Sequence, residues 1–178
     1  MRASATSTRV NRGFAFVDLC GFTDFVDTHG DAAGVAELGR LRSSVREVAP
    51  LCGVRVDKWL GDGAMLVGVD SEPVVQAVLS IEQRVRRGGR LPLRAGVAAG
   101  DVLILEGDDY LGRAVNLAAR LCDLAGPHEI LAASGTVDVP AWVTATAPVA
   151  TEVAGFAEPV PVVALSVRSG RSWLRRTG

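Results

Sequence analysis

Two aspartates stand where they could bind divalent cations. Asp18 lies near the end of Phe14–Leu19, a short run of β-forming residues, and Asp62 lies between two apolar segments. Adjacent carboxylates repel each other, and Mg²⁺ or Mn²⁺ with oxygen ligands removes that cost. A pair of such ions is a common device in phosphoryl chemistry. Asp62 alone also fits an ordinary turn, whereas an acid at the end of an apolar strand needs a partner.

A second polar group lies on a predicted helix. Asn116 and Arg120 are four residues apart within residues 112–125, so they share one face of that helix. A broad apolar surface adjoins them, made of Ala114, Val115, Ala118, Leu121, Cys122 and Ala125. On these residues alone, a solvent-exposed stripe on an amphipathic helix is the simpler interpretation.

The elements that must position these residues follow a regular order. Hydrophobic periodicity predicts helices over 34–48 (ended by Pro50), 71–87 and 112–125. Short apolar runs predict strands over 14–19, 54–60, 64–69, 93–99, 102–105, 129–133, 150–154 and 161–167. Asp-Gly between two apolar segments, at residues 61–63, predicts a hairpin.

The order β-α-β-β-α-β, with extra strands after it, predicts an α+β fold. We expect an antiparallel sheet with helices on one face and a ferredoxin-like core. In that core the first strand lies antiparallel beside the third, so the end of one meets the start of the other. Asp18 and Asp62 are therefore predicted to be neighbours at one edge of the sheet.

Length and composition exclude several classes of protein. The 178 residues fit one domain, expected over 13–168 between a flexible N-terminal tail, 1–12, and a flexible basic C-terminal tail, 169–178. A net charge of −1 gives no electrostatic case for nucleic acid. Three cysteines without a CxxC spacing indicate a reducing compartment. With no membrane-length apolar run and no signal peptide, we expect no membrane partner and a cytoplasmic location.

Three segments resemble motifs of the class III nucleotide cyclases, in the same order along the chain. Residues 16–23 (FVDLCGFT) resemble the first metal motif and residues 58–63 (KWLGDG) the second. Residues 109–120 (DYLGRAVNLAAR) resemble the segment that reads the base and steadies the transition state. Residues 155–159 (GFAEP) are similar to the closing motif. Three ordered motifs with the right internal spacing are strong evidence, and the resemblance covers about residues 14–167.

The resemblance implies an adenylate cyclase that converts ATP to cyclic AMP and pyrophosphate. It implies a class III cyclase homology fold and two divalent metal ions, Mg²⁺ or Mn²⁺, held by Asp18 and Asp62. It also implies that Lys58 and Asp109 read the base. A lysine donor and an aspartate acceptor match N1 and the 6-amino group of adenine, whereas guanine presents the reverse pattern.

The same resemblance assigns Asn116 to the ribose and Arg120 to the charged α-phosphate in the transition state. It implies a homodimer in which the two aspartates come from one subunit and the other four residues from its partner. The chain departs from many cyclases in its closing motif. Where they carry a lysine that grips the triphosphate, this chain has Ala154-Gly-Phe156, without a basic residue.

Two alternatives remain open. The first is a catalytically weak nucleotide-binding or sensing domain on the same fold, and the presence of all six matched residues argues against it. The second is a guanylate cyclase, which Lys58 and Asp109 disfavour because guanine would set donor against donor and acceptor against acceptor.

Overall fold

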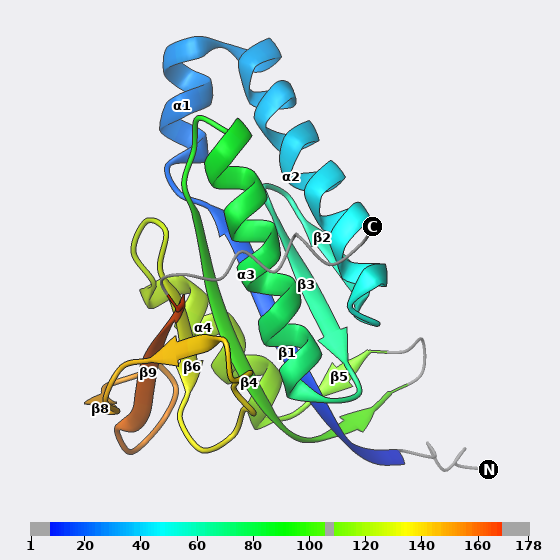
Figure 1. Cartoon of the computed structure of the whole chain (residues 1–178), viewed down its shortest axis with the longest axis vertical. Coiled ribbons are helices and arrows are strands. Elements are labelled where there is room, and N and C mark those ends of the chain that lie inside the picture. The colour runs from blue at the N-terminus through cyan, green and yellow to red at the C-terminus, as the bar shows by residue number, and fades with distance from the viewer. Residues whose placement is uncertain (1–7, 106–108, 169–178) are drawn as a thin grey trace, which may run out of the picture.

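A mixed β-sheet forms the centre of the protein, in a computed structural model that describes residues 8–105 and 109–168 (Figure 1). The helices are α1 (Phe22–His29), α2 (Asp31–Leu51), α3 (Ser71–Gly88) and α4 (Arg113–Leu124). The strands are β1 (Thr8–Leu19), β2 (Arg55–Leu60), β3 (Gly63–Gly68), β4 (Leu93–Ile104), β5 (Tyr110–Leu111), β6 (Ile130–Ala133), β7 (Val143–Ala145), β8 (Val149–Thr151) and β9 (Val160–Val167). The sheet order is β2-β3-β1-β4-β6-β9-β7, with β5 beside β4 and β8 beside β9.

The predicted α+β core is confirmed. The strands β2, β3, β1 and β4 are antiparallel neighbours in the ferredoxin-like order, joined through α2 and α3. In the register between β1 and β3, Asp18 lies opposite Gly63, and between β1 and β4 it lies opposite Arg94. The end of β1 is therefore flanked on one side by the β2–β3 hairpin and on the other by the start of β4.

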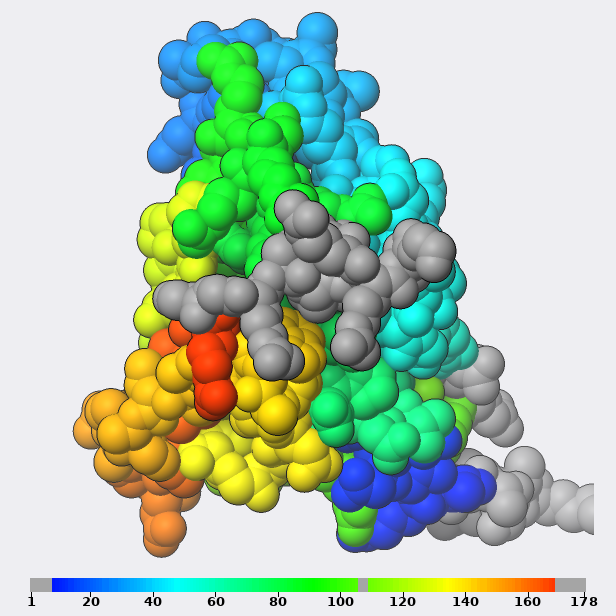
Figure 2. Space-filling model, viewed as in Figure 1, coloured from blue at the N-terminus to red at the C-terminus, as the bar shows by residue number. Residues whose placement is uncertain are grey.

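The helices cover both faces of the sheet, so the prediction of helices on one face was wrong. From β1, Ala15 and Val17 pack in the cluster that includes α2 and α3, whereas Phe14 packs with α4 in a second cluster. Figure 1 shows α3 in front of the sheet and α4 behind it, and Figure 2 shows α2 and α3 side by side over the front face. The reason lies in β3, whose residues are all buried: a strand that is apolar on both faces must be covered on both.

Several predicted boundaries were also wrong. β1 begins at Thr8, so residues 8–12 belong to a strand and not to a tail, while residues 1–7 and 169–178 lie outside the described residues. Strands predicted over 93–99 and 102–105 are one continuous strand, because all of it pairs with the equally long β1. β6 is parallel to β4, which makes the sheet mixed.

The helices α1 and α2 also differ from prediction. The short helix α1 was not expected, and α2 continues through Pro50 to Leu51. A proline this near the end of a helix removes only one hydrogen bond, and Pro50 is exposed, so the last turn tolerates it.

A close approach fixes α4 against the sheet. A Cβ atom at Gly96 in β4 would lie 2.2 Å from the Ala118 carbonyl oxygen and 2.2 Å from the Cys122 amide nitrogen. Real Cβ atoms do not come this near to backbone atoms, so only glycine lets α4 pack at this depth. The buried stripe of α4 then holds its opposite face, which carries Asn116 and Arg120, in a fixed position.

Candidate functional site

Asp18 and Asp62 are neighbours, as predicted. Asp18 lies near the end of β1, and Asp62 lies in the turn between β2 and β3. The backbone amide of Leu19 donates to the carbonyl oxygen of Asp62 at 3.3 Å, which ties the turn to the end of β1. The charge of Asp62 is close enough to raise the pKa of Asp18.

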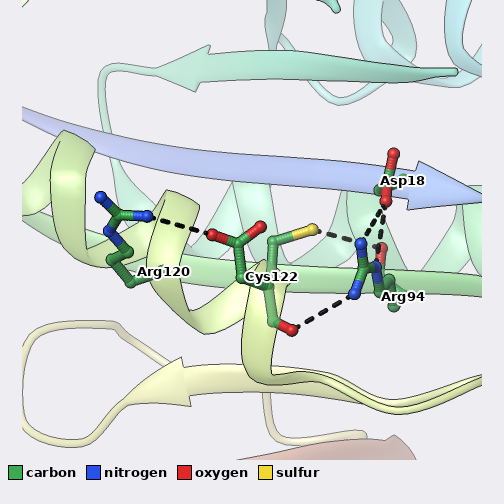
Figure 3. A network of polar contacts seen from close by, with 5 residues as sticks. Asp18, Arg94, Arg120 and Cys122 are labelled. Atoms are coloured by element: carbon green, nitrogen blue, oxygen red, sulfur yellow. Dashed lines mark hydrogen bonds and ion pairs between the residues drawn. The ribbon is translucent and has the colours of Figure 1, made fainter. Parts of the chain in front are cut away.

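Asp18 also has a cationic partner. Nη2 and Nε of Arg94 donate to its Oδ2 at 2.7 and 3.0 Å, and Nη1 of Arg94 donates to the carbonyl oxygen of Asp123 at 3.2 Å (Figure 3). Partial burial raises the pKa of Asp18, the hydrogen bond from Arg94 lowers it, and the net shift is upward. Two opposing effects therefore set the pKa of Asp18: desolvation, which raises it, and the ion pair with Arg94, which lowers it.

Arg94 was not predicted as a site residue, although the sequence carried a signal for it. In the predicted fold, the start of the fourth strand lies beside the end of the first, just as the start of the third does. The strand order that sets Asp62 on one side of Asp18 therefore sets Arg94 on its other side.

The two aspartates fit a site in which a nucleotide supplies the remaining ligands. Among the described residues there is no group of three or more His, Cys, Asp or Glu side chains that could hold a metal ion. Mg²⁺ commonly binds through one or two carboxylates together with substrate phosphates and water, and not in an all-protein cage. Asp18 and Asp62 supply two neighbouring carboxylates, whose oxygen atoms match that mode of binding. Burial raises the pKa of the nearby Cys122 thiol to about 12, so it stays neutral and is a poor metal ligand.

We expect Arg94→Met to raise the pKa of Asp18 further. The substitution removes the hydrogen bond and the positive charge that lower this pKa, and it leaves burial and Asp62 to raise it. A raised carboxyl pKa means that, as the solution is acidified, Asp18 takes up its proton at a higher pH. The measurement is an NMR titration of the Asp18 carboxyl carbon. Arg87→Met, at an exposed arginine on α3, is the control, and an unchanged midpoint in Arg94→Met would contradict the prediction.

Lys58 and Asp109 are brought together from distant parts of the chain. Nζ of Lys58, on β2, lies 2.5 Å from Oδ1 of Asp109, which precedes β5. The side chains are 46% and 53% exposed, so solvent screens the pair. Their hydrogen bond raises the pKa of Lys58 and lowers that of Asp109, so both stay charged.

Aromatic and polar contacts hold this pair in place. The amide of Tyr110 donates to Oδ1 of Asp109 at 3.1 Å. The ring of Tyr110 packs edge-on against Phe14, with ring centroids 5.3 Å apart, and its hydroxyl accepts from Arg55 at 3.1 Å. Tyr110 therefore joins β5 to β1 and β2, and fixes Asp109 beside Lys58.

Asn116 and Arg120 lie on the exposed face of α4 with Arg113. Because these three residues are three and four positions apart, they form one stripe along α4. The stripe lines a cavity of ≈ 570 Å³. The same cavity is lined by Ala119 and, across from the helix, by residues 154–156. Nη1 of Arg120 lies 3.4 Å from Oδ2 of Asp123, one turn further along α4 (Figure 3).

The six residues form separate groups within one chain. Among the described residues, no hydrogen bond or ion pair joins Asp18 or Asp62 directly to Lys58, Asp109, Asn116 or Arg120. The last four are all exposed. One chain thus presents a carboxylate pair at the end of β1, an exposed Lys58–Asp109 pair and a polar stripe on α4.

Solved structures show what this fold is. The adenylyl cyclase CyaB from P. aeruginosa matches with a TM-score of 0.74 and 23% identity, over 93% of this chain and 99% of that one. The guanylyl cyclase Cya2 matches with a TM-score of 0.78 and 18% identity, over 93% of this chain and 97% of that one. The chain has the fold of the class III nucleotide cyclase catalytic domain, and adenylate cyclases are among its homologues.

Two relatives of the chain come from Mycobacterium tuberculosis. An uncharacterised protein is 38% identical over 139 residues, 77% of this chain and 36% of that protein. A pH-sensitive adenylate cyclase is 35% identical over 123 residues, 67% of this chain and 30% of that protein. The chain therefore spans about a third of the length of these relatives. No protein-family model matches the chain. In the part of the chain that the structure describes, no helix is long and apolar enough to cross a membrane.

Proposed function

We propose that this chain is an adenylate cyclase domain that converts ATP to 3′,5′-cyclic AMP and pyrophosphate. The observation that carries the proposal is the pairing of Lys58 with Asp109, which sets one hydrogen-bond donor beside one acceptor in a cyclase fold. The free cysteines Cys20, Cys52 and Cys122 agree with a cytoplasmic location, where ATP is the abundant substrate.

Lys58 and Asp109 suit adenine. The ammonium group of Lys58 donates to N1, and the carboxylate of Asp109 accepts from the 6-amino group. In the free chain these side chains pair with each other, and the base takes the place of that contact. Separating them costs little, because an exposed ion pair of this kind contributes about 0–1 kcal/mol.

Asp18 and Asp62 are proposed to hold two divalent ions, Mg²⁺ or Mn²⁺. When bound, these ions would activate the ribose 3′-hydroxyl and neutralise the triphosphate. The residues on α4 act on the rest of the nucleotide: Asn116 orients the ribose, and Arg120 donates to the α-phosphate oxygens, where negative charge builds in the transition state. No protein nucleophile is needed, because the attacking group belongs to the substrate.

The proposed active unit is a homodimer with two equivalent sites. Asp18 and Asp62 come from one subunit, and Lys58, Asp109, Asn116 and Arg120 come from the other. The exposure of these four side chains in the single chain supports this arrangement, because it leaves them free to face a partner. A two-fold axis then builds each site from both chains.

The proposal is tested by product formation from ATP and from GTP, with Mg²⁺ and with Mn²⁺. We expect cyclic AMP to form faster than cyclic GTP. Nucleotide binding without turnover would instead support a sensing domain, and a preference for GTP would support a guanylate cyclase, the activity named for Cya2.

We expect the double substitution Lys58→Glu with Asp109→Gly to lower ATP use sharply and to raise GTP use relative to ATP. Each buried mispaired contact costs about 1–3 kcal/mol, so losing both changes the ATP preference by roughly a hundredfold or more. The measurement is the ratio of kcat/KM values for the two nucleotides.

A control of matched charge is available on the opposite side of the sheet. Arg84 and Glu47 form an exposed ion pair between α3 and α2, and Arg84→Glu with Glu47→Ala changes the net charge by the same amount. This control should retain the ATP preference. An unchanged preference in the Lys58 and Asp109 variant would show that these residues do not read the base.

A further inference from the structure

Arg113 has no ion-pair partner among the described residues, whereas the other cations of the candidate site each have one. Lys58 pairs with Asp109, Arg94 with Asp18, and Arg120 with Asp123. Over residues 8–105 and 109–168, no ion pair joins Arg113 to an acidic side chain. Within those two ranges, its positive charge is therefore not paired with a carboxylate.

An aromatic ring holds the Arg113 guanidinium at the wall of the cavity. Its Cζ lies 4.4 Å from the centre of the Phe156 ring, within the range of a cation–π contact. Such stacking occupies a face of the guanidinium plane and leaves its N–H groups at the edge available to another acceptor. The ring thus positions Arg113, and no side-chain hydrogen bond within residues 8–105 and 109–168 uses its donors.

The cavity beside Arg113 favours an anion. Among the residues that the structure describes, its lining contains two arginines, Arg113 and Arg120, and no acidic side chain. The first turn of α4 contains no acidic residue either, and its N-cap, Gly112, has no side chain to occupy the free amide groups. At ≈ 570 Å³ the cavity lies in the size range of small-molecule sites.

We propose that Arg113 binds the polyphosphate of the nucleotide, in addition to Arg120, an inference that rests on the proposed function. Arginine suits this role because its planar fork of donors matches phosphate oxygens. Residues 154–156, which face α4 across the cavity, carry no basic side chain. Arg113 then supplies from the helix a positive charge that this segment lacks, and Phe156 is its positioning residue.

The test measures binding without turnover, by titration calorimetry on the full chain. The probes are inorganic tripolyphosphate, 3′-deoxy-ATP with Ca²⁺ or Mg²⁺, and adenosine. We expect Arg113→Ala to weaken tripolyphosphate and 3′-deoxy-ATP by about tenfold or more, the scale of one charge-assisted contact, and to leave adenosine unchanged. Arg87→Ala, which removes an exposed arginine from α3 on the opposite face of the sheet, should bind all three as the wild type does.

A second substitution tests the location of the charge. Ala154 is exposed and lines the same cavity, so Ala154→Lys can offer a cation from the opposite wall. In the Arg113→Ala background we expect it to restore part of the lost affinity for tripolyphosphate. Phe156→Leu, which keeps the charge and removes the aromatic ring, should give an intermediate loss.

The inference and the proposed function fail in different ways. If the wild type forms cyclic AMP and Arg113→Ala binds tripolyphosphate and 3′-deoxy-ATP normally, the role of Arg113 is refuted and the cyclase stands. If the wild type turns over neither ATP nor GTP, yet loss of Arg113 weakens tripolyphosphate binding, the polyphosphate site stands and the cyclase proposal is refuted.

Discussion

We expect Asp18→Ala and Asp62→Ala each to reduce cyclic AMP formation by about a thousandfold or more. Each substitution leaves a single carboxylate where two are proposed to hold the metal ions. Metal ions in such sites contribute several kcal/mol to transition-state stabilisation, and each 1.36 kcal/mol is a factor of ten in rate. The measurement is initial velocity at saturating ATP with Mn²⁺, together with thermal unfolding to show that the fold remains.

Two variants separate the loss of a ligand from other effects. Asp18→Asn keeps an oxygen that can accept from Arg94 but removes the charge, so it should be nearly as inactive as Asp18→Ala. Asp101→Ala removes an exposed carboxylate whose contact is with Asn11 on the neighbouring strand, and it should be active.

In the wild type, Mn²⁺ should support more activity than Mg²⁺, which gives up its bound water reluctantly. Normal turnover in either alanine variant of the pair would contradict the metal assignment.

Mixing two inactive variants should restore activity if the sites are shared between subunits. Asp18→Ala and Arg120→Ala each form homodimers without an intact site. In a heterodimer of the two, one site collects both substitutions, and the other takes Asp18 and Arg120 from unaltered copies. Random exchange makes roughly half of the dimers mixed, each with one good site. At saturating ATP, where each intact site works at its own maximal rate, the mixture should recover roughly a quarter of wild-type activity.

Subunit exchange must be verified alongside this measurement. Differently tagged chains report it by co-purification, and cyclic AMP formation is followed before and after co-incubation. The control mixes Asp18→Ala with Asp62→Ala, which lie in the same residue set, so every site in their heterodimer lacks one carboxylate. Confirmed exchange without recovery in the first mixture would place both residue sets in one subunit.

Local patterns predicted much of the candidate site. The Asp-Gly hairpin and the ferredoxin-like order were enough to place Asp62 beside Asp18, because strand pairing fixes which ends meet. The helix that carries Asn116 and Arg120 was predicted to within a residue at each end, because its buried positions recur with a helical period. The assignment of roles to these residues came from the family resemblance, and it stays a prediction.

Features that depend on contacts across the fold were missed. The position of α4 on the far side of the sheet follows from strands that are buried on both faces, and the prediction considered one face. The role of Arg94 becomes evident only from the pairing of β4 with β1, which sets it opposite Asp18. Arg113 belongs to the matched motif, yet its contact with Phe156 joins segments far apart in the sequence.

The polar network in Figure 3 has a consequence for cooperativity. Within one chain, Asp18 contacts Arg94, Arg94 contacts Asp123, and Asp123 contacts Arg120. In the proposed dimer, the first of these residues belongs to one active site and the last belongs to the other. Arg94 donates to the main-chain carbonyl oxygen of Asp123, whereas Arg120 contacts its carboxylate. A metal ion that draws Asp18 away from Arg94 would therefore act on Arg120 through the last turn of α4. Occupancy of one site would then alter substrate affinity at the other, and the dependence of rate on ATP concentration would depart from a simple hyperbola.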